Sequence, residues 1–348
     1  MAGVLDGITI IEMAGIGPGP FAGMMLADHG ARVIRVERVG APDMQGRDVL
    51  TRNREVIQID TKSAEGVAQV RELVKAADGI FEGFRPGVME RMGLGPDVLL
   101  ADNPKLVYGR MTGWGQTGPL AMAAGHDINY ISITGNLHGY GRPDGKPTPP
   151  TNAIGDFAGG GMMLAFGMVS ALLNVARGGE GQVVDVAMTD GASIIHAMQW
   201  GFRGLGMWED TRGVNMLDTA AHFYDTYECA DGKWISIGSI EPQFYALLRK
   251  TLGLDADPAF DAQMDKSQWP ALKAKLTDIF KTKTRDEWSA IMEGTDICYG
   301  SIQSMGEALS HPHNVARGTF VKVNGVDQPA PAPRFLGTPA AVPVGRKG

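Results

Sequence analysis

Short apolar runs alternate with longer segments of helical periodicity through the first half of the chain. Each run has four to six residues and is bounded by polar or turn-forming residues, a pattern typical of buried strands. The predicted strands are residues 8–13, 32–36, 56–59, 79–84, 106–111 and 183–186. Strands that alternate with helices favour βα units and a mostly parallel sheet.

Two helical patterns between these runs support that interpretation. Residues 20–29 place Phe21 and Leu26 among the apolar positions of one helix, which ends at Gly30. Ser63 is positioned to cap a second helix over 63–77, whose apolar residues form one stripe. Residues 1–189 are therefore predicted to form a large, doubly wound α/β domain.

The second half of the chain lacks the regular alternation of strand and helix patterns. We predict a linker over 190–224. It contains a helix over 192–201 and, after the helix, a polar stretch with glycines. A smaller α/β domain over 225–318 follows, because that part contains a strand pattern, a helix pattern and two capping boxes. These are a strand at 234–237, a helix at 242–252, and the pairs Thr284 with Glu287 and Ser304 with Glu307.

The C-terminal tail is rich in proline between 329 and 343, which leaves little room for regular structure. We expect this segment to be an extended strap that returns over the large domain. Residues 319–348 would then complete the large domain.

Composition narrows the class of protein. A chain of 348 residues is long enough for two domains, and 44% apolar with 20% charged residues indicates a globular protein. The formal net charge of -7 argues against a nucleic-acid partner, which needs a surplus of Lys and Arg. No run approaches the ~18 apolar residues of a membrane span.

Cysteine content and the chain ends predict the compartment. Cys229 and Cys298 are too few for a disulfide framework and suit a reducing environment. Residues 1–11 lack the features of a leader, and the last residues match no peroxisomal or lipidation signal. The expected location is the cytoplasm. His311 and His313 have no further ligands in their pattern, so no metal site is predicted.

The glycine-rich turn Gly15-Ile16-Gly17-Pro18-Gly19-Pro20 follows the first predicted strand, where dinucleotide phosphates often bind. Pro18 and Pro20 remove amide donors from this turn, which disfavours a nicotinamide or flavin site. A rigid turn that lets another group approach the backbone is the preferred interpretation.

Three arginines follow predicted parallel strands. Arg38 comes after the second strand, and Arg85 and Arg91 come after the fourth. Ligands of open α/β sheets bind beyond the carboxyl ends of the strands, so these cations are candidates for a phosphate-bearing ligand. The alternative is that they are ordinary solvated surface arginines.

An imidazole and two carboxylates stand near glycine-rich segments. His126 and Asp127 lie in Gly125-His126-Asp127-Ile128-Asn129-Tyr130, and Asp156 precedes the glycine run 159–161. Such groups can move a proton at a carbonyl compound. The structural alternatives are a packing role for the histidine and a simple cap by Asp156 for a helix over 162–176.

Several motifs resemble the family III CoA-transferases. They are Gly109-Arg110-Met111-Thr112-Gly113-Trp114-Gly115-Gln116-Thr117-Gly118-Pro119, Gly83-Phe84-Arg85-Pro86-Gly87, Arg52-Asn53-Arg54 and Asp60-Thr61-Lys62. The segment 125–130 with Gly155-Asp156-Phe157 is similar to the branch of that family whose members racemise 2-methylacyl-CoA thioesters. The resemblance extends from residue 8 to about residue 336.

The resemblance implies a fold and a set of roles. Members are interlocked homodimers with a large Rossmann-like domain and a small domain. His126 and Asp156 would be the two catalytic bases, Glu241 would hydrogen-bond the imidazole, and amides near Asp156 would hold an enolate oxygen. CoA would be part of the substrate, with no separate cofactor. The CoA contacts implied are Arg38, Ile59, Asp60, Thr61, Lys62, Gly83, Phe84, Arg85, Arg91, Gly125, Asp127, Ile128, Asn129 and Tyr130.

Asp127 leaves a second activity open. Transferases of the family use an aspartate as acyl acceptor, and Asp127 stands where that nucleophile is expected, although Asn129-Tyr130 replaces the typical Gln-Ala pair. The alternatives to racemisation are thus acyl transfer through Asp127 and non-catalytic acyl-CoA binding. Met188, Met198, Met207 and Met216 could contact an acyl chain or pack in a core.

Overall fold

The computed structural model describes residues 3–42 and 46–347. The chain divides into two compact units, and each is described by itself. The large unit comprises Met1–Leu137, Pro150–Met198 and Pro312–Gly348, and the small unit comprises His138–Pro149 and Gln199–His311. These limits differ from the predicted ones, because residues 138–149 belong to the small unit, residues 312–318 belong to the large unit, and helices occupy much of the predicted linker.

The large unit contains a parallel sheet, and its described residues form six strands in the order β3-β2-β1-β4-β5-β6. The predicted strands are confirmed, with ends displaced by one or two residues. Because the order reverses between β1 and β4, the sheet has a topological switch point there. The strands are β1 (Thr9–Met13), β2 (Arg32–Glu37), β3 (Glu55–Gln58), β4 (Gly79–Glu82), β5 (Val107–Thr112) and β6 (Gln182–Ala187).

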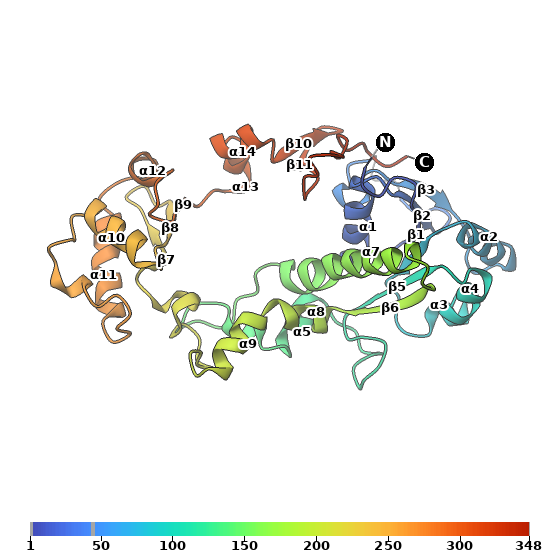
Figure 1. Cartoon of the computed structure of the whole chain (residues 1–348), viewed down its shortest axis with the longest axis horizontal. Helices are drawn as coiled ribbons and strands as arrows, with labels where there is room; N and C mark the ends of the chain where they lie inside the picture. Colours follow the sequence, from blue (N-terminus) through green and yellow to red (C-terminus); the bar gives the residue numbers. More distant parts are fainter. Residues whose placement is uncertain (1–2, 43–45, 348) are drawn as a thin grey trace. The chain divides into compact units, whose positions relative to one another are not determined.

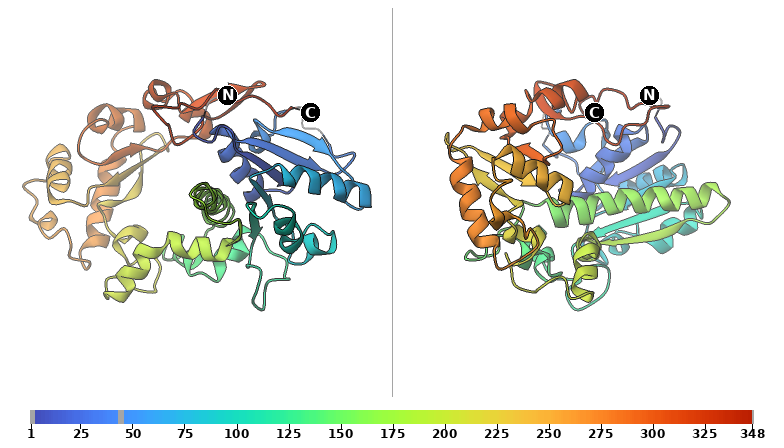
Figure 2. Two further views of the ribbon diagram at one scale, coloured as in Figure 1. Left: turned by 45° about the vertical axis from the view of Figure 1, so that its right-hand side comes forward. Right: turned by 60° about the vertical axis from the view of Figure 1, so that its left-hand side comes forward.

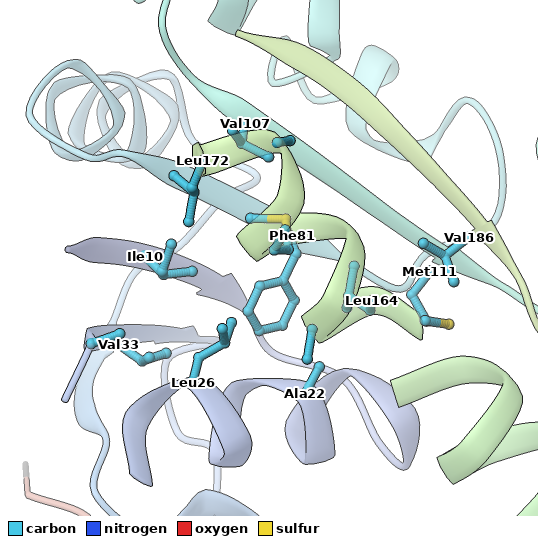
Figure 3. Close-up of a cluster of buried hydrophobic side chains, with 14 of the residues drawn as sticks. Ile10, Ala22, Leu26, Val33, Phe81, Val107, Met111, Leu164, Leu172 and Val186 are labelled. Atoms are coloured by element: carbon cyan, nitrogen blue, oxygen red, sulfur yellow. The ribbon is translucent and has the colours of Figure 1, made fainter. Parts of the chain in front are cut away.

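Helices cover both faces of this sheet (Figure 1). Adjacent residues of β1 point to opposite faces, so Ile10 packs with α1 and α7 while Ile11 packs with α2 and α4. Figure 3 shows the first of these cores, with Phe81 between the sheet and Leu26 and Leu164 of the helices. The helices that lie wholly within the large unit are α1 (Pro18–Asp28), α2 (Ala64–Lys75), α3 (Val88–Arg91), α4 (Pro96–Asp102), α5 (Asp127–Ser132), α7 (Met163–Ala176), α8 (Met188–Ile195) and α14 (Pro312–Arg317). The residues of α6 (Asn136–Gly139) and α9 (Ala197–Gly204) are divided between the two units.

The helix before β6 begins earlier than predicted. A π-helix, η2 (Ala153–Met162), leads directly into α7, so Asp156 lies within a helical segment and does not cap α7. The combined run Ala153–Ala176 is long and apolar enough to cross a membrane by length and composition. One side of it, including Leu164 and Met168, is buried in the core of the large unit.

Buried arginines tie the tail to the large unit. Arg54 is fully buried and its Nε donates to Glu12 Oε2 at 2.9 Å. Arg52 donates to Asp28 Oδ2 at 2.5 Å and to the Pro329 carbonyl at 2.7 Å. These arginines, noted for the family resemblance, therefore hold the fold together. The Pro329 carbonyl ends a hairpin of β10 (Phe320–Val323) and β11 (Val326–Pro329).

The predicted strap over the large domain is confirmed. Lys347 forms a parallel bridge with Glu55 beside β3, and Asn53 exchanges hydrogen bonds with Val344. Figure 2 shows the C-terminal segment running alongside the first strands of the sheet. Arg346 also reaches Glu37 at 2.9 Å.

The small unit is described throughout. It contains an antiparallel three-stranded sheet in the order β7-β8-β9. Both predicted capping boxes are confirmed, since Thr284 and Glu287, and Ser304 and Glu307, bond reciprocally. The elements are β7 (Tyr224–Glu228), β8 (Trp234–Gly238), β9 (Tyr299–Ser301), α10 (Pro242–Thr251), α11 (Trp269–Phe280), α12 (Arg285–Met292), α13 (Met305–Ala308) and the π-helix η3 (Met216–Ala220). Short 3₁₀ turns are η1 (Val49–Thr51) in the large unit and η4 (Pro258–Phe260) in the small unit.

His222 makes the small unit sensitive to acid. Its ring is fully buried, its Nε2 lies 2.7 Å from Tyr245 Oη, and burial, with a contribution from Lys273, lowers its pKa to about 4. An unfolded chain has the ordinary pKa of about 6.5, so it binds the proton more readily than the folded chain between pH 6.5 and 4. Stability is therefore complete above pH 6.5 and falls by about 3 kcal/mol as the pH drops to 4.

His222→Phe is expected to reduce this acid sensitivity by about 3 kcal/mol, because no imidazole remains to be protonated. The measurement is the denaturant midpoint at pH 7.5 and at pH 4.5, followed by tryptophan fluorescence. His138→Gln, a change at a less buried histidine of the same unit, is the control. An equal loss of stability in His222→Phe and the parent chain would contradict the account.

Candidate active site

A cavity of about 690 Å³ lies in the large unit at the carboxyl ends of β1, β4, β5 and β6. It therefore includes the switch point between β1 and β4, where ligands of open α/β sheets bind. The loop after β1 contributes Gly15 to Pro20, and the loop after β4 contributes Gly83 to Pro86. His126, Asn129, Tyr130 and Asp156 complete the polar part of the lining, and Met188 is part of the apolar lining.

His126 is held at the start of α5. It has an extended backbone conformation as the N-cap, and its N–H donates to Asn129 Oδ1 at 3.0 Å. Its carbonyl accepts the N–H groups of Asn129 and Tyr130, which starts the helix. The side chain is exposed and lines the cavity. The predicted imidazole is thus presented to the cavity by a fixed backbone.

Asp156 reaches the same cavity from the first turn of η2. Asn152 Nδ2 donates to its Oδ2 at 3.0 Å. Burial raises the pKa of Asp156, the Asn152 hydrogen bond lowers it, the Asp127 charge raises it and the His126 charge lowers it, with a net upward shift. The predicted pair His126 and Asp156 is therefore brought together, on two different elements around one cavity.

Glycines allow η2 to pack closely enough to place Asp156 there. A side-chain carbon at Gly159 would lie 2.6 Å from Ala192 N of α8, and one at Gly161 would lie 2.8 Å from the Pro18 carbonyl of α1. Gly17 has a positive φ of 65°, and a side-chain carbon there would lie 3.5 Å from Asp156 Oδ2. The turn predicted to admit another group thus admits the Asp156 carboxyl.

Asp127 is next to His126 but is turned away from the cavity. Its side chain is buried, it does not contribute to the lining of the cavity, and its Oδ1 accepts the N–H of Asp156 at 2.7 Å. The amide of Asp156 itself is therefore already bonded, and the prediction that amides near Asp156 hold an enolate oxygen loses this donor. Among the carboxylates at this place, the one that faces the cavity is Asp156.

The other predicted CoA contacts lie along the same edge of the sheet. Arg38 follows β2, the segment Ile59, Asp60, Thr61 and Lys62 follows β3, and Gly83, Phe84 and Arg85 follow β4. Because all these strands are parallel, their carboxyl ends share one edge. Only the segment after β4 lines the cavity; Arg38 and residues 59–62 lie farther along the edge.

Three cations along this edge are available to a ligand. Arg38, Arg85 and Arg91 are exposed, and within residues 3–42 and 46–347 no carboxylate lies within ion-pair distance of them. Glu90, which neighbours Arg91, pairs with Arg110 at 2.8 Å instead. Free guanidinium groups of this kind suit phosphate oxygens.

Two further interactions shape the cavity and were not predicted. Glu82 is buried at the end of β4, where it accepts the Phe84 N–H at 2.6 Å and pairs with Arg110 at 3.2 Å. Burial raises the pKa of Glu82 to about 7 against the opposing effects of Phe84 and Arg110. This residue fixes the loop that carries Arg85. Its position as the last strand residue before Gly83 is the signal that could have identified it.

Tyr130 lines the cavity and is held by residues of the loop before α5. Its hydroxyl donates to the Gly125 carbonyl, and its ring packs edge-on against Trp114. Burial and the Asp156 charge raise the pKa of Tyr130, while the Arg85 charge lowers it. Tyr130 is therefore close to both charged groups. Ile128 is exposed on α5 and does not line the cavity.

Glu241 belongs to the small unit. It is exposed and precedes α10, whose first amides bond its backbone carbonyl at 3.0 Å and leave its carboxylate without a capping bond. Its hydrogen bond to the imidazole of His126 remains a prediction. In the described residues, no group of three or more His, Cys, Asp or Glu side chains is arranged to hold a metal ion.

Comparison with known proteins gives consistent matches over nearly all of the chain. The family model described as CoA-transferase family III matches residues 5–345. The alpha-methylacyl-CoA racemase of Mus musculus is 44% identical over 338 residues, which cover 97% of this chain and 88% of the relative. The alpha-methylacyl-CoA racemase of Homo sapiens is 44% identical over 337 residues, which cover 97% and 87%.

Comparison of the fold with solved structures finds the same family of proteins. A crystal structure of a CaiB/BaiF family protein from Brucella suis superposes with a TM-score of 0.85 and 28% sequence identity, covering 100% of this chain and 97% of that one. The family motifs, the parallel sheet and the cavity at its switch point thus occur together in one chain. This chain belongs to the CoA-transferase family III.

Proposed function

We propose that this protein interconverts the 2R and 2S epimers of 2-methylacyl-CoA thioesters by 1,1-proton transfer. The observation that carries the proposal is the pair of unlike bases, His126 and Asp156, that line one cavity from two elements. Relatives 44% identical to this chain are named alpha-methylacyl-CoA racemase, which supports the same substrate class.

The chemistry requires a base on each face of C2. For one epimer, neutral His126 takes the C2 proton, the C–H electron pair moves into the thioester as an enolate, and protonated Asp156 returns a proton to the opposite face. For the other epimer, the Asp156 carboxylate abstracts and the imidazolium donates. Burial raises the pKa of Asp156, which favours the protonated form needed by the donor. Protons and electrons balance, so the reaction consumes no cofactor.

CoA is proposed to bind along the edge that leads from the cavity to β2 and β3. Arg85 stands at the cavity, and Arg38 lies farther along the same edge. Their unpaired guanidinium groups would contact the pyrophosphate and the nucleotide phosphate. The remaining predicted contacts, residues 59–62 among them, follow the same edge.

Arg85→Met and Arg91→Met are each expected to raise KM for an acyl-CoA about tenfold with little change in kcat, because each removes a charge-assisted bond of about 1.5 kcal/mol. The matched comparison is the acyl-pantetheine thioester, which lacks the phosphates and should show the same KM in parent and variants. Arg177→Met, at an exposed arginine beyond α7, is the protein control. Equal KM values for acyl-CoA in all four proteins would contradict the phosphate assignment.

A homodimer is proposed from the exposed face of α7 and the residue before it. Met162, Phe166, Val169 and Leu173 are spaced by three or four residues, so they share one face of the helical run, and all are exposed in the single chain. A contiguous apolar face of this kind marks an interface. A second copy of the chain would cover it, as in the interlocked arrangement implied by the family resemblance.

A cytoplasmic location is proposed as well. Both cysteines are free thiols, Cys229 buried and Cys298 exposed, as expected in a reducing compartment.

The function is tested by offering the pure protein a 2R-methylacyl-CoA together with a free carboxylic acid as acyl acceptor. Chiral analysis of the thioester should show conversion toward an epimeric mixture, with no acyl-CoA formed from the added acid. Transfer of CoA to the acid without epimerisation would support the transferase alternative. Binding without either reaction would indicate an acyl-CoA-binding protein.

A further inference from the structure

We propose that Asp127 is a positioning residue that links the two bases. Its side chain holds the backbone of Asp156, and its own backbone is bonded directly to His126. The proposal rests on the racemase function and deepens it. In this view the residue that could have been an acyl acceptor acts on the proton-transfer pair without touching substrate.

Geometry gives Asp127 this linking position. It is the first residue of α5 and is bonded directly to His126, the N-cap. Its carboxylate crosses to η2, where Oδ1 accepts the Asp156 N–H at 2.7 Å. Asp127 therefore joins the backbone of His126, through a peptide bond, to the backbone of Asp156, through a hydrogen bond. This hydrogen bond helps to fix the separation of the two bases.

Packing around Asp127 leaves it little freedom. The residue is 3% exposed, and a side-chain carbon at Gly155 would lie 2.7 Å from its Oδ1. Glycine at 155 is thus the residue type that admits the carboxylate at this distance. The second oxygen, Oδ2, is buried and has no hydrogen-bond partner within the described residues. A buried carboxylate with one free oxygen keeps much of its charge effective at its neighbour.

Few charged groups surround Asp156 besides Asp127. Charged residues on the elements packed against η2 are Asp28 on α1, His126 and Asp127 at α5, Asp190 on α8, Arg110 on β5 and Asp185 on β6. Of these, Asp127 and His126 affect the pKa of Asp156, in opposite directions. Asp28 pairs with Arg52, and Arg110 pairs with Glu82 and Glu90. Asp185 accepts the Gln116 N–H.

A two-base racemase benefits from such a neighbour. The forms that react, imidazole with carboxylic acid and imidazolium with carboxylate, contain the same number of protons and are tautomers of one another. A negative charge beside Asp156 stabilises the first form relative to the second and brings their populations closer. Each epimer then finds its reactive tautomer. The pH profile of kcat/KM must be the same in both directions, because the equilibrium between epimers fixes their ratio.

Two substitutions separate the charge of Asp127 from its position. Asp127→Asn keeps an acceptor for the Asp156 N–H and removes the charge, so the acid limb of the kcat/KM profile is expected to move to lower pH. Gly155→Ala keeps the charge and displaces the carboxylate, so kcat is expected to fall about 10- to 100-fold with little change in KM and an acid limb closer to that of the parent. Asp190→Asn, an equal charge change on an exposed residue of α8, is the control.

A direct titration makes the result independent of turnover. The carboxyl carbon of Asp156, observed by ¹³C NMR and assigned with Asp156→Asn, should titrate at lower pH in Asp127→Asn than in the parent chain and Asp190→Asn. An unchanged titration and pH profile in Asp127→Asn, with parent-like kcat in Gly155→Ala, would overturn the proposal. Should the parent chain show no racemisation, the titration alone still tests the link, so failure of the function and failure of the link are distinguishable.

Discussion

Replacing either base is expected to slow inversion strongly while leaving hydrogen exchange at C2 in one epimer only. In His126→Ala, Asp156 can still remove the proton on its own face and return a solvent-derived proton to that face. In Asp156→Asn, His126 does the same for the opposite epimer. Loss of the acid on the far side should reduce inversion about 10³-fold, within the range for one general acid or base.

The two variants are therefore expected to exchange hydrogen in opposite epimers, and this difference identifies the face on which each base stands. Each pure epimer is incubated in deuterated water with each variant, and label and configuration at C2 are measured by mass spectrometry and chiral separation. Asp190→Asn, with its exposed carboxylate on α8, should behave as the parent. Exchange of the same epimer by both variants would show that the two residues do not stand on opposite faces.

Introducing a charge on the exposed side of α7 is expected to break the homodimer. Phe166 is 71% exposed in the single chain and lies in the middle of the apolar face formed with Met162, Val169 and Leu173. An aspartate at 166 would have to be buried without a partner, a cost of several kcal/mol that one interface residue can impose. Phe166→Asp should therefore run as a single chain of 37.1 kDa at micromolar concentration.

Light scattering coupled to size exclusion measures this mass directly. Phe166→Leu is the matched control, because it keeps an apolar side chain at the same place and should retain the mass of two chains. A parent protein that already has the mass of one chain would contradict the dimer. A Phe166→Asp protein with the mass of two chains would place the interface elsewhere.

The sheet was predictable because strands buried on both faces leave continuous apolar runs in the sequence. Their ends moved by a residue or two, as for β5, which begins at Val107 and extends through Thr112. Ser63 and the two capping boxes were predictable for a local reason, since the bonding partners are three residues apart. The strap was predictable from proline content, but its bridge to Glu55 depends on tertiary pairing.

The helix that carries Asp156 was predicted to start too late. Gly155, Gly159, Gly160 and Gly161 have low helix propensity, and the predicted helix begins only after them, at residue 162. The structure makes them helical because their missing side chains allow contact with α1, α5 and α8. Tertiary packing therefore decides the conformation, and it turns a predicted cap into a residue inside a π-helix.

The site could be predicted as a set of residue types but not as a geometry. Asn152 stands four residues before Asp156, a helical spacing that could have identified it as a partner. Nothing in the sequence distinguishes the buried Asp127 from the exposed His126 beside it, because that difference arises where α5 meets η2. The predicted helix over 192–201 also divides into α8 and α9 at His196.

The most direct test of racemisation is a time course with the parent protein and pure 2R-methylacyl-CoA in deuterated water. Two bases on opposite faces of C2 predict that deuterium enters C2 as the 2S epimer forms, until both epimers are present and labelled. A 2R substrate that stays unlabelled and uninverted, while the protein binds it, would contradict the central claim.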